Sequence, residues 1–507
     1  MTFMSKQSNL KIEVANELAP SASATAIAAC IFENDSSLSH ASDEVLAVIQ
    51  EVLGSAEFKG EEETSLLLHT ARSLSVATNR LILLGMGEHV DDDPHALRHA
   101  AATAVRIARQ VRVSQLNFIL PACKDERLMT RAVAEGALLG LYENNFYQNR
   151  DEEQSELEKL TIIVSKESEG LREEIERARI VAESVNWTRT LSDEPGANLP
   201  PQEFARRAAE MAEEFGLHVE SLDADEIRAR GMGGLWGVGQ GSEEKPRMIV
   251  IRYEPEGAKP DDELWAFVGK GITFDTGGIS IKHGLDMYEM KTDMAGGAAA
   301  LGALRAIAQL KPARRIVAIV PSAENMPSGH SLKPGDVLKT LAGYTIEAVD
   351  TDAEGRLVLV DGITYARQLG ASRIVDLATL TGSIIVALGE HRTGLFSNDD
   401  DWANQVLEAG ERAGEPAWRM PVSDDYKKKI ESDIADFKNY GGRPDATAAA
   451  LLLSKFAQKT PWVHLDIAGT SWYDDARPFA PKGSTGVGVR TLVELACGQS
   501  VEPKRDV

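Results

Sequence analysis

The sequence predicts an α/β protein of two domains, in which a smaller N-terminal α/β domain precedes a larger domain with a mostly parallel or mixed sheet flanked by helices. Three observations support this fold class. The chain has 507 residues, 43% of them apolar and 26% charged, which is enough for two domains with substantial cores. Short apolar segments alternate with helical segments, as strands joined by helices do. An acidic stretch at residues 151–158 (DEEQSELE) has the composition of a solvated linker.

The first third of the chain carries the elements of the smaller domain. Its expected strands are residues 80–85 (RLILLG) and 115–121, and its expected helices are residues 93–110 and 131–142. A further helix over about 171–189 leads into a stretch rich in turn residues at 192–201. We therefore place the N-terminal domain at residues 1–170, a linker helix at 171–190 and the larger domain at 191–507.

The larger domain shows the alternation of strands and helices most clearly. We expect strands at residues 264–269 (LWAFVG), 315–321 and 373–377, and helices at residues 294–310 and 355–369. Continuously apolar strands joined by helices of this length are typical of a mostly parallel sheet that is covered on both faces. In such sheets binding sites gather at the carboxyl ends of the strands.

Charge and cysteine content argue against several function classes. The net charge is −24, from 54 Lys and Arg against 78 Asp and Glu, which disfavours nucleic acid as the main partner. Cys30, Cys123 and Cys497 are too far apart in the sequence for a thiolate zinc motif or a disulfide framework. The charge-free stretch at residues 18–32 is shorter than the ~20 apolar residues of a membrane span and lacks a basic leader. We expect a cytoplasmic protein with no membrane association.

Four carboxylates lie on loops that should open at one edge of the predicted sheet. Asp275 follows the first strand, Asp293 precedes the first helix, and Asp352 and Glu354 precede the second. Carboxylates brought together in one crevice repel one another unless cations lie between them. Bridging carboxylates can hold two divalent metals about 3.5–4 Å apart, as in two-metal hydrolases. The sequence therefore predicts a binuclear metal centre with oxygen ligands.

A purely structural role is the alternative for each acid by itself. Isolated acidic residues before helices are usually caps or partners of the helix dipole, and Asp293 and Asp352 can both be interpreted in this way. The combination favours a site, because three successive loops place charge beside glycines that permit close approach of the backbone. These loops are residues 268–278 (VGKGITFDTGG), 292–300 (TDMAGGAAA) and 350–357 (DTDAEGRL).

These segments resemble the leucyl aminopeptidase (cytosol aminopeptidase) family of dinuclear metallo-exopeptidases. The resemblance covers about residues 186–493 and includes the motifs ENMP, PGDV, DLATLTG, GGRP and HLDIAGT. It implies an N-terminal domain of macro-like fold and a cytoplasmic homohexamer. It also implies a metalloprotease that hydrolyses peptides with free N-termini and releases one residue at a time, with leucine-like residues preferred.

The resemblance assigns metal ligands position by position. Asp275 and Glu354 would bridge two divalent ions, either Mn²⁺ or Zn²⁺. Asp352 would complete one metal site, and Lys270 with Asp293 would complete the other. A lysine ligand is unusual, because only the neutral amine has a lone pair, so its pKa must fall from about 10.4.

The resemblance also implies the remaining roles at the site. Lys282 would stabilise the oxyanion of the tetrahedral intermediate. Arg356 would hold a bicarbonate that acts as general base toward the metal-bound water. Met290, Thr379 and Gly382 would line the substrate pocket, although ordinary core packing explains Met290 equally well.

The sequence departs from the family pattern at several positions near these residues, and two of these changes are the most relevant. Asp350 replaces the usual Asn at the head of the DTDAEGRL segment, which adds a negative charge two residues from Asp352. His283 follows Lys282 where proline is usual. Neither change removes a metal or catalytic position, so we expect an active enzyme. The sequence does not specify its metal preference or its rate.

Two other functions compete with this interpretation. A two-metal phosphoesterase uses the same kind of centre, but few basic residues accompany these loops. A DNA-binding or regulatory assembly with incidental peptidase activity would need a basic groove, against which the acidic composition argues.

Overall fold

The computed structural model describes residues 9–18, 25–33, 42–55, 57–74, 78–90, 92–149 and 156–498. Most of the expected acidic linker, residues 151–155, lies outside them. The chain divides into two compact units, Met1–Asn186 with Asp474–Gly483 and Trp187–Tyr473 with Ser484–Val507. The two-domain α/β architecture expected from the sequence is confirmed. Among the described residues, no helix has both the length and the hydropathy that a membrane span requires.

The N-terminal unit contains a six-stranded sheet in the order β1-β6-β5-β2-β4-β3. Only β3 runs antiparallel to its neighbour. The strands are β1 (Lys11–Ala15), β2 (Thr25–Ile31), β3 (Ser65–Leu74), β4 (Thr78–Gly85), β5 (Gln115–Ile119) and β6 (Lys159–Ile163), and the helices are α1 (Asp43–Gly54), α2 (Pro94–Gln110) and α3 (Glu126–Gly140). The expected helix at 131–142 thus begins five residues earlier, where Asp125 caps it.

A long helix, α4 (Glu169–Asp193), covers the segment that the sequence suggested as a linker helix. It contains the boundary between the two units, which falls after Asn186. The turn-rich stretch that follows forms the short helix η1 (Gly196–Asn198).

The larger unit is built on a nine-stranded mixed sheet in the order β16-β15-β18-β14-β9-β11-β8-β7, with β10 paired to β11. The central pairs β18-β14, β14-β9 and β9-β11 are parallel. The strands are β7 (His218–Leu222), β8 (Arg247–Tyr253), β9 (Leu264–Gly269), β10 (Gly271–Asp275), β11 (Arg315–Asn325), β14 (Arg373–Ala378), β15 (Thr393–Ser397), β16 (Ala417–Arg419) and β18 (Trp462–Asp466).

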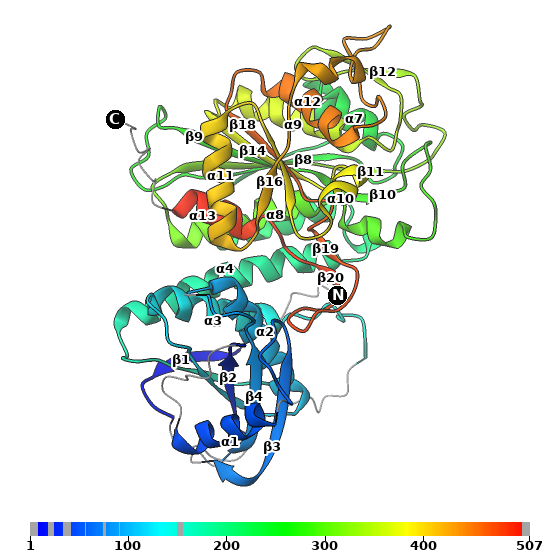
Figure 1. Cartoon of the computed structure of the whole chain (residues 1–507). Helices are drawn as coiled ribbons and strands as arrows, with labels where there is room; N and C mark the ends of the chain where they lie inside the picture. Colours follow the sequence, from blue (N-terminus) through cyan, green and yellow to red (C-terminus); the bar gives the residue numbers. More distant parts are fainter. Residues whose placement is uncertain are drawn as a thin grey trace. The chain divides into compact units, whose positions relative to one another are not determined.

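Helices cover both faces of this sheet. Figure 1 shows α7, α9 and α12 together on one face, and α8 with α13 on the other. The helices are α5 (Pro201–Glu214), α6 (Ala224–Ala229), α7 (Gly233–Gly239), α8 (Ala295–Leu310), α9 (Gly355–Gln368), α10 (Gly382–Leu388), α11 (Asp400–Ala413), α12 (Asp445–Ala457) and α13 (Val489–Cys497). Because both faces are covered, every residue of β9 is buried, which explains its unbroken apolar sequence.

The remaining strands lie outside the large sheet. A separate three-stranded sheet contains β12 (Asp336–Lys339), β13 (Thr345–Ala348) and β17 (Phe437–Lys438). Two further short strands, β19 (Trp472–Tyr473) and β20 (Gly483–Ser484), come later in the sequence.

Glycines bring the start of α8 against the end of β9. A Cβ on Gly269 would lie 2.3 Å from the carbonyl oxygen of Gly296, so no side chain fits at that contact. The N–H of Gly297 donates to the carbonyl of Lys270 at 2.8 Å. This close approach places Lys270, at the strand end, next to Asp293, just before the helix.

Candidate metal centre

Carboxylates from three loops meet at the carboxyl ends of the central strands. Asp275 ends β10, Asp293 precedes α8 and Glu354 precedes α9. Each offers one oxygen, and these oxygens lie within 4.8 Å of one another. The three residues are only 2%, 6% and 1% exposed. Buried carboxylates at this spacing require positive charge among them.

Two lysines supply part of that charge. Lys270 Nζ lies 2.8 Å from both Asp293 Oδ1 and Glu354 Oε1. Lys282 Nζ lies 2.9 Å from Asp275 Oδ2 and 2.5 Å from Asp352 Oδ1. The structure thus brings together six of the residues that the sequence suggested for the site, and the four carboxylates exceed the two ammonium groups by two negative charges.

Protonation equilibria reflect this crowding. Burial, together with the neighbouring carboxylates, raises the pKa of Asp275 well above its ordinary value. Burial also raises the pKa of Asp293 to about 6, although Lys270 acts in the opposite direction. For Glu354, the two lysines outweigh burial and lower the pKa. Burial disfavours the ammonium of Lys270, but Asp293 and Glu354 outweigh it and raise that pKa.

The donor set fits divalent metal ions. Asp293 Oδ2 and Glu354 Oε2 are buried and have no hydrogen-bond partner among the described residues. Buried polar atoms are normally paired, so buried carboxylate oxygens without a partner form a donor set that suits a cation. Hard divalent ions take such oxygen ligands. The backbone also allows the close packing, because a Cβ on Gly355 would lie 2.7 Å from Lys270 Nζ.

Arg356 lies in the first turn of α9, and its guanidinium is held by a residue that the sequence did not reveal. Its Nη1 and Nη2 atoms donate to the two carboxylate oxygens of Asp445 at 2.9 and 3.2 Å, and Nη1 also donates to the carbonyl of Asn439 at 2.8 Å. Asp445 begins α12 and follows the GGRP motif directly, a first-turn position where an acid also interacts favourably with the helix dipole. Arg356 Nε is buried without a hydrogen-bond partner in the described part of the chain.

The three expected pocket residues have different surroundings. Thr379 Oγ1 donates to Asp293 Oδ1 at 2.7 Å, and its carbonyl accepts from Lys270 Nζ at 3.0 Å, so Thr379 contacts the cluster itself. Gly382 begins α10, is exposed and has open space where a Cβ would lie. Met290 is half-buried in the short helix η2 (Met287–Thr292), and its carbonyl accepts the N–H of Asp293 at 3.4 Å.

Two asparagines that sequence analysis missed support the ligand loops. Asn325 Nδ2 donates to Asp275 Oδ1 at 2.9 Å. Asn439 Nδ2 donates to the carbonyls of Asp350 and Ala353 at 2.6 and 3.1 Å. The ENMP motif contains Asn325, but nothing in that motif indicated which side chain the amide contacts.

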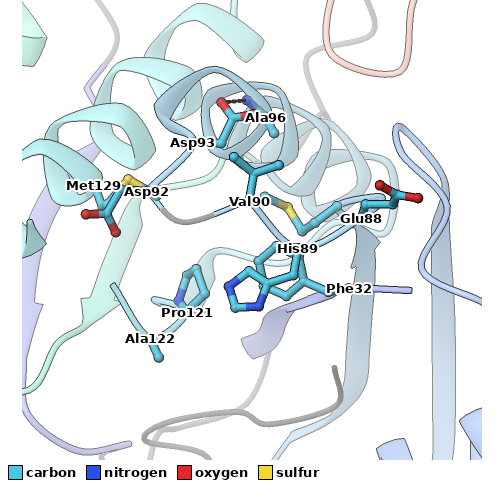
Figure 2. Close-up of a pocket in the computed structure, with 11 residues that line it drawn as sticks. Phe32, Glu88, His89, Val90, Asp92, Asp93, Ala96, Pro121, Ala122 and Met129 are labelled. Carbon is cyan, nitrogen blue, oxygen red and sulfur yellow. Dashed lines mark hydrogen bonds between the residues drawn. The ribbon is translucent and has the colours of Figure 1, made fainter. Parts of the chain in front are cut away.

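A pocket in the N-terminal unit lies where β2, β4 and β5 end (Figure 2). Phe32, His89 and Pro121 line it, beside Asp92 and Asp93. Both acids already bind backbone donors: Asp93 caps α2 through the N–H groups of residues 95 and 96, and Asp92 accepts from those of residues 124 and 125. The carboxylates of Asp92 and Asp93 therefore hold a loop and a helix end in place.

Comparisons with known proteins agree with the geometry of the larger unit. The model of the cytosol aminopeptidase family catalytic domain matches residues 186–493, and that of its N-terminal domain matches residues 30–151. The probable cytosol aminopeptidase of Alkaliphilus metalliredigens is 43% identical over 96% of this chain and 99% of its own length. That of Koribacter versatilis is 43% identical over 91% of this chain and 93% of its own length.

Solved structures give the same result. A mutant of tomato leucine aminopeptidase superposes with a TM-score of 0.87 at 30% identity, covering 98% of both chains. The bottromycin maturation enzyme BotP in complex with Mn has a TM-score of 0.81 at 32% identity, over 94% of this chain and 99% of its own. The chain belongs to the cytosol aminopeptidase family and is a peptidase hydrolase.

Proposed function

We propose that this enzyme releases single N-terminal residues, preferably leucine-like ones, from peptides with free N-termini, using two divalent metal ions. The observation that carries the proposal is the buried cluster of carboxylates with unpaired oxygens on Asp293 and Glu354. Such oxygens, in a member of this peptidase family, are expected to bind cations. The Mn named for BotP supports manganese, and zinc is the other candidate.

The residues present can hold two ions. Asp275 and Glu354 would bridge them, Asp352 would complete one site, and Asp293 with Lys270 would complete the other. When bound, such ions lower the pKa of a coordinated water and so supply hydroxide near neutral pH. Lys270 must give up a proton to act as a ligand, because its ammonium has no lone pair.

The chain's own residues perform the remaining steps. Lys282 lies at the rim of the cluster with its side chain 23% exposed, so its ammonium can approach a substrate carbonyl and stabilise the oxyanion that forms. Arg356 has one buried donor without a partner in the described residues, Nε, and would hold a bicarbonate there, which would supply a general base. The leucine preference would depend on Met290 and on the open space beside Gly382.

Removing and restoring the metals tests this proposal. Dialysis against EDTA should abolish hydrolysis of leucine-p-nitroanilide, and added Mn²⁺ or Zn²⁺ should restore it, because the carboxylates cannot activate water without the ions. Metal analysis should find two ions per chain in the reloaded protein. N-acetyl-leucine-p-nitroanilide, whose amine is blocked, serves as the matched substrate control and should not be cleaved. Cleavage of p-nitrophenyl phosphate in place of leucine-p-nitroanilide would contradict the assignment and favour the phosphoesterase alternative.

We further propose that the enzyme is cytoplasmic and assembles as a homohexamer. Light scattering coupled to size exclusion should give about six times the 54.9 kDa mass of the chain. A monomer at micromolar concentration would refute the hexamer and leave the assignment of the metal ligands unaffected.

A further inference from the structure

Asn325 contacts the cluster from the neighbouring strand. It ends β11 and pairs in register with Asp275, which ends the parallel strand β10. The residue is 4% exposed, and its Nδ2 donates both to Asp275 Oδ1 at 2.9 Å and to the carbonyl of Thr351 at 3.0 Å. Both partners are acceptors, so the NH₂ group, and not the amide oxygen, must face them.

The contact leaves the two oxygens of Asp275 with different surroundings. Oδ1 accepts from Asn325 Nδ2 and also from the N–H of Gly277 at 2.8 Å, which uses the two lone pairs that a carboxylate oxygen offers. Oδ2 lies 2.9 Å from Lys282 Nζ. Oδ1 thus has both lone pairs occupied by hydrogen bonds to the protein, whereas Oδ2 lies beside the ammonium group of Lys282.

The same amide also connects two ligand loops. Thr351 lies between Asp350 and Asp352, and its Oγ1 donates to the carbonyl of Gly277 at 2.7 Å. The N–H of Ser280 donates back to Thr351 Oγ1 at 2.8 Å. Asn325 therefore lies at the junction of the loop that carries Asp275 and the loop that carries Asp352 and Glu354.

We infer that Asn325 is a positioning residue for the metal centre, which fixes Asp275 so that it presents a single oxygen to the cations. This inference rests on the proposed two-metal function. A side chain that orients a ligand is expected to govern metal affinity, and loss of such a partner typically weakens binding by about 10- to 100-fold. A residue that only fills space at the end of β11 would not change metal affinity in this way.

Metal titration of the full-length, EDTA-treated protein tests the inference. Asn325→Leu removes both donors at similar volume and should weaken binding of the less tightly held Mn²⁺ about 10- to 100-fold in calorimetry. Thr276→Val is the matched control, because Thr276 Oγ1 donates to the carbonyl of Asn325 at 2.7 Å and accepts from the N–H of Gly278 at 3.2 Å, and it hydrogen-bonds to no carboxylate among the described residues. The control should bind Mn²⁺ nearly as tightly as the wild type.

Asn325→Ser provides a second variant should the leucine variant fold poorly, since its hydroxyl is too short to replace the amide. The inference is overturned if either folded variant binds two Mn²⁺ as tightly as the wild type. It is also overturned if Thr276→Val weakens binding as much, or if circular dichroism shows both Asn325 variants unfolded, since stability would then be the residue's role. Failure of the wild type itself to bind Mn²⁺ and cleave leucine-p-nitroanilide would instead refute the proposed function.

Discussion

Replacing Lys282 by alanine should leave a folded protein whose kcat for leucine-p-nitroanilide falls about 100- to 1000-fold, the usual cost of removing one oxyanion donor. The Lys282 side chain is partly exposed, and among the ion pairs described its ammonium contacts only the buried carboxylate of Asp275 and the half-buried one of Asp352. Its loss should therefore change the chemistry more than the stability. Steady-state kinetics at saturating metal, with a thermal melt of the same sample, measures both effects.

His283→Ala is the matched control for this experiment. His283 is the exposed neighbour of Lys282 on the same loop, so its replacement changes the same segment but leaves the ion pairs of Lys282 with Asp275 and Asp352 in place. The control should retain wild-type turnover. Equal activity in the Lys282 variant and the wild type would remove Lys282 from the proposed mechanism, whereas an equal loss in the His283 variant would indicate that loop order, and not the ammonium, determines the rate.

Replacing Glu354 by glutamine should abolish binding of at least one metal and reduce kcat/KM more than 100-fold, beyond the ~10- to 100-fold typical for residues that only support a ligand. Glu354 is 1% exposed, and one of its oxygens is paired with Lys270 while the other is unpaired. The amide keeps the volume of the side chain but cannot bridge two cations as a carboxylate does. Metal analysis after dialysis and kinetics with leucine-p-nitroanilide provide the two measurements.

Glu324→Gln controls for the loss of a partly buried acid in the same domain. Glu324 lies on β11, accepts from Ser242 Oγ at 2.6 Å and belongs to no metal cluster in the described residues. It should retain both metals and near-normal activity. Two metals bound to the Glu354 variant with wild-type affinity would show that this carboxylate is not a bridging ligand.

Much of the larger unit could be predicted from its apolar segments. The strand expected at residues 264–269 coincides with β9, and the expected helices at 294–310 and 355–369 differ from α8 and α9 by one residue at one end. These elements are buried on most sides, so burial alone determines their composition. The strand expected to end at Pro321 continues to Asn325 in β11. Its polar last residues stay in the sheet because their backbone pairs with that of β10. β10 was missed, since its sequence GITFD reads as part of a glycine-rich loop.

The acids of the candidate site were predictable because parallel strands bring their carboxyl ends to one edge. Their supporting partners were not. Asp445 meets Arg356 across 89 residues of sequence, and Asn325 meets Asp275 across 50. Such pairs depend on strand register and on helix placement, which a single sequence does not specify. Conversely, the leucine preference still depends on family resemblance, because the surroundings of Met290 and Gly382 do not define a complete pocket.

The ammonium of Lys270 sits between Asp293 and Glu354, where an incoming dication would have to bind. In the proposed centre, metal binding would release protons, and Lys270 would have to lose its own proton to act as a ligand. Acid would oppose this release and strip the ions, while mildly alkaline buffer would favour uptake. Protein purified at low pH would then contain less than its full complement of metal ions. Its measured kcat would be lowered by the missing ions as well as set by the chemistry of the site.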